Sequence, residues 1–406
     1  MQQIKFFIPL AMTSILIVVT HSLFNMALAR FPSPEIYISA FAVAKSFMHL
    51  FESPIMVMKQ TAAALVEDGE SYRKIKKAFL VIGATMVILF GIIVFVGITE
   101  WIMRNIMGLK DDIVKEALTI IKILILFPGV VTFRGLLQGV SIKLRATSLL
   151  TLSTVIRAIH TGIIVLIVDR LVMISPPSII AGLMFLGAAI VETLVMYIGS
   201  KVSMGNITES LDISKTNSQQ SNNKDKEMVC GDGLSYRMIF YFFVPLVLTS
   251  LMNNLTTPII NTGLGRTYNP ELAISAYAVA WGFGTIITSP LNMFHQIPLN
   301  FYEDNKDAKQ IAKLAIGIVL FLTSIMTFIS FTDVGYNILR DIIGATQEIS
   351  SLAVGVLKWM TLIPLLSTTR EFFWGILMKR RMTKFIGGGK IANLIILVLS
   401  ISIVTL

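Results

Sequence analysis

Four ionisable side chains lie at helical spacing within one apolar stretch near the N-terminus. His49, Glu52 and Lys59 follow Lys45 by 4, 7 and 14 positions. At about 100° per residue the four positions fall within about 80° of one another on a helix, so they share one face. Histidine and glutamate can carry protons, and lysine can hold an anion. The rest of the stretch is largely apolar, which predicts a membrane helix whose charged face contacts protein or water.

The whole chain has the composition of an integral membrane protein. Of its 406 residues, 54% are hydrophobic and only 14% are charged, whereas soluble proteins carry about 25% charged residues. The first apolar run has no cleavage site and is interpreted as a membrane helix, not as a signal peptide. The single cysteine, Cys230, excludes an internal disulfide framework. Eleven spans are predicted, over residues 6–29, 36–66, 78–101, 114–140, 149–168, 178–200, 240–263, 273–300, 313–332, 349–376 and 385–406.

The two halves of the sequence are copies of one another. A constant shift of 236 positions aligns residues 6–60 with residues 242–296 at 22 identities in 55 positions. The same shift pairs Pro128 with Pro364, and Arg134 with Arg370. We therefore predict an all-α integral membrane protein with two parallel bundles of about six transmembrane helices each. The second copy lacks its last helix in this chain.

A polar stretch separates the two copies. Residues 201–237 are rich in Ser, Asn, Lys and Asp, a composition that does not form a packed core. The predicted organisation is a six-helix N-terminal lobe over residues 1–200, a flexible cytoplasmic linker over 201–237, and a C-terminal lobe over 238–406 with five helices.

The distribution of basic residues predicts the orientation. With a cytoplasmic N-terminus, 19 basic residues lie in cytoplasmic segments and 7 in outer segments, which agrees with the positive-inside rule. Six spans in the first copy return the chain to the cytoplasm, so both copies insert in the same direction. Parallel repeats of this kind are a transporter architecture. We expect a multi-pass protein of the plasma membrane.

The predicted membrane interior carries an excess of positive charge. Buried cations need a counter-charge, so this excess favours an anionic solute over an organic cation. The basic residues inside spans are Lys45, Lys59, Lys122, Arg134, Arg157, Lys358, Arg370 and Lys390. The acidic residues well inside spans are Glu52, Glu192 and Glu371.

Several of these groups also allow a structural interpretation. Some cations could simply extend to the membrane surface, namely Lys59, Lys122 and Lys390. Arg157 and Glu192 could form an ion pair between the fifth and sixth helices. His49 could be a buried histidine with satisfied hydrogen bonds or a proton carrier. Arg134 and Arg370 occupy equivalent positions in the two copies, which favours a place on the solute pathway.

The charged face is differentiated between the copies. In the second copy its positions hold Trp281, Thr285, Thr288 and His295. Asn253, Thr257 and Asn261 are spaced i, i+4 and i+8 on the seventh span, and we expect them to face the surface of His21 and Asn25 on the first span. The residues predicted to line the substrate or ion pathway are Asn25, Lys45, His49, Glu52, Lys59, Arg134, Asn253, Asn261, His295, Arg370 and Glu371.

Two motifs in the first copy resemble a known transporter superfamily. They are IPLxxTS at the start of the first span and SAFAVAKSFMHLFESP in the second, which contains Ser46, Met48, Phe51 and Pro54. The pattern resembles the multidrug and toxic compound extrusion (MATE) family, and it is more similar to the progressive ankylosis branch of the same superfamily. The resemblance implies two lobes around a central cavity that opens alternately to each side. It further implies H⁺- or Na⁺-driven antiport in drug exporters and export of anions such as pyrophosphate, citrate or nucleotides in the ankylosis branch.

The sequence departs from the drug exporters at their cation-coupling carboxylates. The first span has no Asp and the seventh has no Glu, which leaves Glu52 with His49 as the candidates for coupling. An enzyme is not expected, because the loops hold no histidine and no metal-binding spacing. The glycine run before Lys390 is no phosphate-binding loop, since Ile391 follows where Ser or Thr is required.

The predicted function is secondary active transport. We expect export of a small anionic solute, coupled to H⁺ or Na⁺, by a monomer surrounded by membrane lipids. No cofactor, metal ion or nucleic acid is expected as a partner. Two alternatives are a MATE-type multidrug or organic-cation antiporter and a flippase for lipid-linked diphosphates.

Overall fold

The structure is a computed structural model that describes residues 2–144, 146, 148–221, 234–302, 305–380 and 383–405. These residues form helices and connecting turns, with no strand among them. Six of the helices are individually long and apolar enough to cross a membrane, and two bent pairs raise the number to as many as eight. The predicted all-α membrane fold is confirmed.

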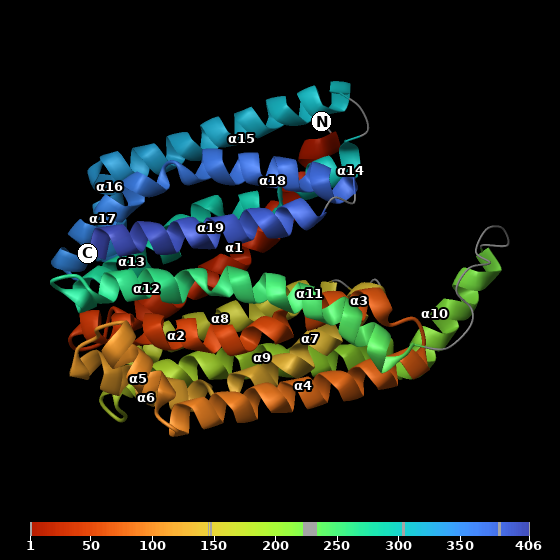
Figure 1. Ribbon diagram of the computed structural model, residues 1–406, viewed down its shortest axis with the longest axis horizontal. Helices are drawn as coiled ribbons and strands as arrows, with labels where there is room; N and C mark the ends of the chain where they lie inside the picture. Colours follow the sequence, from red (N-terminus) through yellow and green to blue (C-terminus); the bar gives the residue numbers. More distant parts are fainter. Residues whose placement is uncertain are drawn as a thin grey trace.

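The N-terminal lobe is built from the first part of the chain (Figure 1). Its elements are α1 (Gln2–Leu28), α2 (Pro34–Met56), α3 (Met58–Leu65), α4 (Gly69–Phe95), α5 (Ile98–Trp101), the π-helix η1 (Ile102–Ile106), α6 (Asp111–Leu124), α7 (Phe127–Lys143), α8 (Ser148–Val172) and α9 (Pro177–Met204). The helix α10 (Ile207–Ser221) follows and extends beyond one end of the bundle in Figure 1.

The C-terminal lobe repeats this order of elements. It comprises α11 (Tyr236–Asn254), α12 (Thr256–Gly265), α13 (Pro270–Thr288), the 3₁₀-helix η2 (Ser289–Met293), α14 (Gln296–Phe301), α15 (Asn305–Phe331), α16 (Asp333–Asn337), the π-helix η3 (Ile338–Ile342), α17 (Gln347–Met360), α18 (Ile363–Lys379) and α19 (Thr383–Thr405). Among the described residues, this lobe has no counterpart of α9.

The sequence repeat is reproduced by irregular features of the backbone. The π-helices η1 and η3 are separated by the same shift of 236 positions, and Gly108 and Gly344 after them adopt left-handed φ angles of 68° and 82°. The pairs α6–α7 and α17–α18 are each bent by 43°. Pro128 and Pro364 lie at these bends, where the proline ring removes a backbone donor from the helix. The duplication therefore extends from the sequence to the course of the chain.

Helices of the two lobes pack against one another along their length. The helix α1 lies between the lobes and packs on α8 of its own lobe and on α13 of the other, while α2 packs on α11 and α13. We call the end of the bundle that carries α10 the linker end. The opposite end, with the turns from α1 to α2 and from α12 to α13, is called the far end (Figure 1).

Aromatic packing forms the centre of the N-terminal lobe. The ring of Phe185 on α9 lies with its centroid 4.9 Å from Phe24, 5.1 Å from Phe127 and 5.5 Å from Phe41. These rings come from α1, α7 and α2, so one buried side chain joins four helices. Because interlocked rings fix the helices on which they lie, they also fix the polar groups that project from α2, α7 and α9 nearby.

Part of the predicted linker is helical. In α10, the side chain of Leu211 is 1% exposed, and Asp212 Oδ1 accepts a hydrogen bond of 2.8 Å from the backbone N–H of Gly69. A carboxylate at this position satisfies a free N–H group at the start of α4. Residues 222–233 of the predicted linker lie outside the described residues.

Candidate functional site

Five charged or ionisable side chains form a continuous chain of contacts inside the N-terminal lobe. His49 Nδ1 lies 2.8 Å from Glu52 Oε2, and Glu52 Oε1 lies 3.8 Å from Arg134 Nη2. Arg134 Nη1 and Arg157 Nη1 both reach Glu192 Oε2, at 2.7 and 2.8 Å. We call His49, Glu52, Arg134, Arg157 and Glu192 the N-lobe cluster.

The N-lobe cluster joins four helices deep within the protein. His49 and Glu52 come from α2, Arg134 from α7, Arg157 from α8 and Glu192 from α9. Both carboxylate side chains are only 4% exposed, and both arginine side chains are 13% exposed. Buried charges of this kind persist only when they are paired and hydrogen-bonded. We call the charged face formed by Lys45, His49, Glu52 and Lys59 the α2 stripe. The cluster supplies the protein partners that this face was expected to need.

Close helix packing brings Arg134 to the α2 stripe. Gly139 on α7 has no room for a side chain, since a Cβ atom there would lie 2.5 Å from Cβ of Ala62 and 2.7 Å from the carbonyl oxygen of Lys59. The missing side chain lets α7 approach α3, the continuation of α2. As a result, the guanidinium of Arg134 lies within reach of Glu52.

Positive charge exceeds negative charge around this cluster. Lys45 is close enough to Glu52 for their charges to interact, and Lys59 is similarly close to Arg134 and Glu192. With the two arginines, four cations therefore surround the two carboxylates. Moreover, Nε and Nη2 of Arg157 are buried and have no hydrogen-bond partner among the described residues. Such donors can hold the oxygens of an anion.

A second cluster lies in the C-terminal lobe. His295 Nδ1 is 2.8 Å from Glu371 Oε2, and Arg370 Nη2 is 2.8 Å from Glu371 Oε1. Gln296 Nε2 lies 2.9 Å from His295 Nε2. Since a glutamine amide nitrogen can only donate, the geometry assigns the proton of a neutral His295 to Nδ1, which then donates to Glu371. We call these four residues the C-lobe cluster.

The two clusters are related by the repeat but differ in exposure. Arg134 and Arg370 are equivalent positions, yet their side chains are 13% and 47% exposed. In the N-terminal lobe α9 covers Arg134 and supplies Glu192, whereas Arg370 pairs with its neighbour on α18 and lies over the ring of Trp374 at 5.0 Å. Lys390 lies over the same ring at 4.8 Å. The N-lobe cluster is therefore the more enclosed of the two.

Equivalent asparagines connect the lobes. Asn25 Nδ2 donates to the carbonyl of Ala278 at 3.0 Å, and Asn261 Nδ2 donates to the carbonyl of Ala42 at 3.5 Å. The shift of 236 positions relates the two donors, Asn25 and Asn261, and also the two acceptors, Ala42 and Ala278, so the two hydrogen bonds are equivalent. The expectation that Asn261 faces Asn25 is therefore wrong: the pseudo-twofold arrangement places each of the two helices against the second helix of the opposite lobe.

The remaining predicted asparagine has a different position. The side chain of Asn253 is exposed, and its neighbour Asn254 makes the contacts between lobes instead. Asn254 Nδ2 donates to Ser53 Oγ at 2.7 Å and to the carbonyl of His49 at 3.2 Å. Asn254 therefore connects α11 directly to the turn of α2 that carries the cluster. The place of Asn253 on the pathway stays a prediction, and the hydrogen bonds between the lobes come from Asn254.

Comparison with known proteins decides the family. The family model described as progressive ankylosis protein (ANKH) matches residues 1–230 and 227–406. The chain belongs to the progressive ankylosis family. The resemblance noted in the first two spans is thereby confirmed over both lobes.

Solved structures show the same fold as this family member. An inward-facing multidrug resistance MATE family transporter of the MOP superfamily matches with a TM-score of 0.56 and 16% identity, covering 91% of this chain and 81% of its own. The eukaryotic MATE transporter AtDTX14 matches at 0.52 and 12%, covering 93% and 82%. A MOP superfamily transporter from Pyrococcus furiosus matches at 0.51 and 14%, covering 92% and 83%. The fold is thus that of multi-pass membrane transporters.

The structure brings together residues that were predicted to have separate roles. The pair of Arg157 with Glu192 is confirmed, but it is not isolated, because Arg134 shares the same carboxylate oxygen. Gln138, which carries no charge and is not among the predicted pathway residues, donates a hydrogen bond of 3.3 Å to Glu192 Oε1. Its position one turn after Arg134 on the same helix face is the signal that could have identified it.

Proposed function

We propose that the protein is a secondary active transporter for a small anionic solute and that the N-lobe cluster is the place where this solute is held during passage. The observation that carries the proposal is the charge balance of the enclosed site. Among the described residues, Lys45, Lys59, Arg134 and Arg157 lie around two carboxylates, and two buried nitrogens of Arg157 have no hydrogen-bond partner there. An anion with several oxygens supplies the missing negative charge and the missing acceptors.

The polarity of the site supports an anion more than a cation. A cation would have to displace the arginines from Glu52 and Glu192, which leaves buried guanidinium groups without a counter-charge. The site therefore carries an excess of positive charge, whereas a cationic drug needs an excess of negative charge. Within similar folds the polarity of the pocket is known to vary, since the Pyrococcus furiosus transporter is described by a reverse polarity of its binding pocket.

Proton coupling is the part of the proposal that rests on His49. Histidine changes charge near neutral pH, and here it lies against Glu52, which in turn faces Arg134. Gain of a proton by His49 adds a third cation beside Glu52, after Lys45 and Arg134, and weakens the hold of that carboxylate on Arg134. The guanidinium of Arg134 then becomes more available to the solute. We infer that protons, and not Na⁺, exchange for the anion.

The expected orientation places the linker end in the cytoplasm of the cell, with the solute leaving from the far end at the plasma membrane. This orientation rests on the excess of basic residues at the linker end. Protons that enter the cell down their gradient across such a membrane would drive the export of the anion.

Flux measurements in proteoliposomes test the proposal. Labelled pyrophosphate or citrate is loaded inside, and its exit is followed with an inward proton gradient. Lys45→Gln and Lys59→Gln each reduce the charge excess without removing an arginine from Glu192, and each should lower the flux at least tenfold. The matched control is Lys122→Gln, which removes an exposed lysine of a predicted span outside the cluster. Equal losses in all three variants would contradict a role of the cluster in anion passage.

A further inference from the structure

The two lobes differ at a pair of packed helices that the sequence repeat makes equivalent. In the N-terminal lobe α4 packs on α7, and a Cβ atom on Gly83 of α4 would lie 2.9 Å from both Cβ and Cγ2 of Thr132 on α7. This close approach therefore requires glycine. In the C-terminal lobe the repeat places Val319 of α15 at the position of Gly83, and Thr368 of α18 at that of Thr132. Because valine adds side-chain atoms that glycine lacks, α15 cannot approach α18 in the same way.

A groove of about 330 Å³ lies between α15 and α18, which run side by side in the C-terminal lobe (Figure 1). A second difference between the lobes adds to this space. Phe79 of α4 is fully buried, whereas its equivalent on α15 is Ala315, which lines the groove. Apart from two threonines the lining is apolar, and it consists of Ala312, Ala315, Ile316, Val319, Leu320, Leu365, Thr368, Thr369 and Phe372.

The rim of the groove faces the membrane. The side chains of Ile316 and Leu320 on α15 are 59% and 63% exposed, and that of Leu365 on α18 is 54% exposed. The helix α15 is itself a candidate membrane span, and α18 is half of a bent pair that together is long and apolar enough to cross. Exposed apolar side chains on spanning helices contact the hydrocarbon chains of lipids. The groove therefore opens toward acyl chains.

The length and position of the groove match one leaflet of a bilayer. Its lining on α15 runs from Ala312 to Leu320, a distance of about 12 Å at about 1.5 Å per residue. Half of a hydrocarbon core of about 30 Å is about 15 Å. Since α15 begins at Asn305 at the linker end, the groove lies mainly in the leaflet on that side (Figure 1).

Two lysines lie above the groove on the same helix face. Lys309, Lys313, Ile316 and Leu320 are spaced i, i+4, i+7 and i+11 on α15, which places them along one side of the helix. Both lysine side chains are exposed, and they lie nearer the linker end than the two apolar residues do. Lysines at the membrane surface attract the anionic head groups of lipids. The face thus combines positive charge at the membrane surface with an apolar groove beneath it.

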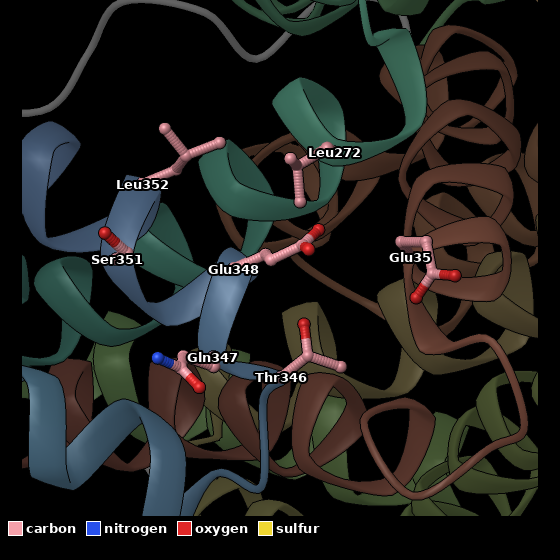
Figure 2. A pocket seen from close by; sticks show the side chains of 7 residues that line it. All are labelled: Glu35, Leu272, Thr346, Gln347, Glu348, Ser351 and Leu352. Atoms are coloured by element: carbon pink, nitrogen blue, oxygen red, sulfur yellow. The ribbon is translucent and has the colours of Figure 1, made fainter.

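The groove differs in its chemistry from the cavity at the far end. That cavity, of about 830 Å³, has a lining with no basic side chain, and the carboxylates of Glu35 and Glu348 are directed toward the same space (Figure 2). Two carboxylates repel a phosphate group. Both charge and polarity therefore favour the groove between α15 and α18 for a molecule with an anionic head and an apolar chain.

We propose that this groove binds an anionic phospholipid of the leaflet at the linker end. The phosphate group lies at Lys309 and Lys313, and one acyl chain lies along Ile316 and Leu320 against Leu365 of α18. The lipid fills the space between α15 and α18, whereas the corresponding helices of the N-terminal lobe pack directly on one another. The site is separate from the N-lobe cluster and does not depend on which solute the protein transports.

Competition between two lipids tests the part of the site that holds the acyl chain. The purified full chain is equilibrated in detergent with equal amounts of palmitoyl-oleoyl phosphatidylglycerol and phosphatidylcholine, and native mass spectrometry counts the lipids that stay bound. The unsubstituted protein should retain one phosphatidylglycerol. Ala315→Phe installs the ring that α4 has at the equivalent position and should lower this retention at least tenfold. Gly317→Phe is the matched control, because it adds the same ring to α15 where the space around the backbone is open.

Unchanged retention in Ala315→Phe, or an equal loss in Gly317→Phe, would overturn the groove as the place of the acyl chain. Displacement of the bound lipid by glycerol phosphate at an equal concentration would overturn it as well, since a head group alone would then account for binding.

Substitution of exposed lysines tests the part of the site that holds the head group, and it stays informative if Ala315→Phe does not fold. Lys309→Gln together with Lys313→Gln should reduce the preference for phosphatidylglycerol over phosphatidylcholine at least fivefold. The equivalent pair on α4, Arg73→Gln together with Lys77→Gln, should leave the preference unchanged, because α4 packs closely on α7. Equal effects of the two pairs would show a general attraction of anionic lipid to this end of the protein and would overturn the site.

Discussion

The ion-pair network around Glu192 makes a quantitative prediction about stability. The carboxylate of Glu192 is 4% exposed and pairs with Arg134 at 2.7 Å and with Arg157 at 2.8 Å. Glu192→Gln keeps the shape of the side chain but removes the counter-charge of both arginines. Removing one partner of a buried ion pair costs about 3–5 kcal/mol. Because the glutamine carbonyl still accepts one hydrogen bond, we expect a loss of about 3 kcal/mol in the free energy of unfolding.

Unfolding by SDS in mixed micelles measures this loss. Glu209→Gln serves as the control, since Glu209 is an exposed carboxylate on α10 and its neutralisation should change the free energy of unfolding by less than about 0.5 kcal/mol. A loss below about 1 kcal/mol for Glu192→Gln is the range of exposed ion pairs and would refute the reasoning.

The same variant separates structural pairing from anion binding. With Glu192 neutral, Glu52 is the remaining carboxylate near both guanidinium groups among the described residues, so an added anion should compensate for the loss. Pyrophosphate should therefore raise the melting temperature of Glu192→Gln by more than it raises that of the unsubstituted protein. A smaller rise in the variant would show that these arginines do not bind the anion.

Three further outcomes are expected. Gly139→Ala should lower the free energy of unfolding by about 1–3 kcal/mol through overpacking, whereas Gly162→Ala, which has open space around it, should not; equal effects would contradict the close approach of α7 to α3. Asn25→Ala should cost about 1 kcal/mol in SDS unfolding and more than Asn261→Ala, because its hydrogen bond is 3.0 Å long against 3.5 Å; the reverse order would contradict the geometry between the lobes. His49→Gln should make anion flux independent of an imposed pH gradient, and a persistent dependence would exclude His49 as the coupling group.

Much of the architecture could be predicted from sequence because it depends on features that are local or repeated. Both bends lie at Pro128 and Pro364, which the shift of 236 positions pairs in the sequence, and a proline inside a span favours a bend because it removes a backbone donor. The stripe on α2 was predictable because helical spacing fixes which side chains share a face. Neither inference needs knowledge of how helices are arranged around one another.

The partners of the stripe could not be predicted, because they depend on which helices become neighbours. Arg134, Arg157 and Glu192 are separated by up to 58 positions, and only packing brings them to one carboxylate. The contact of Asn254 with Ser53 was not predicted for the same reason: spacing identifies a face, but the facing helix decides which residue makes contact.

The selectivity of flux between an anion and a cation tests the central claim most directly. The purified full chain is reconstituted once, and exit of labelled pyrophosphate or citrate and of ethidium is measured side by side under the same proton gradient. The charge balance of the N-lobe cluster predicts flux of the anion at least tenfold above that of protein-free liposomes, and no flux of ethidium above that background. Ethidium flux without anion flux would contradict the account.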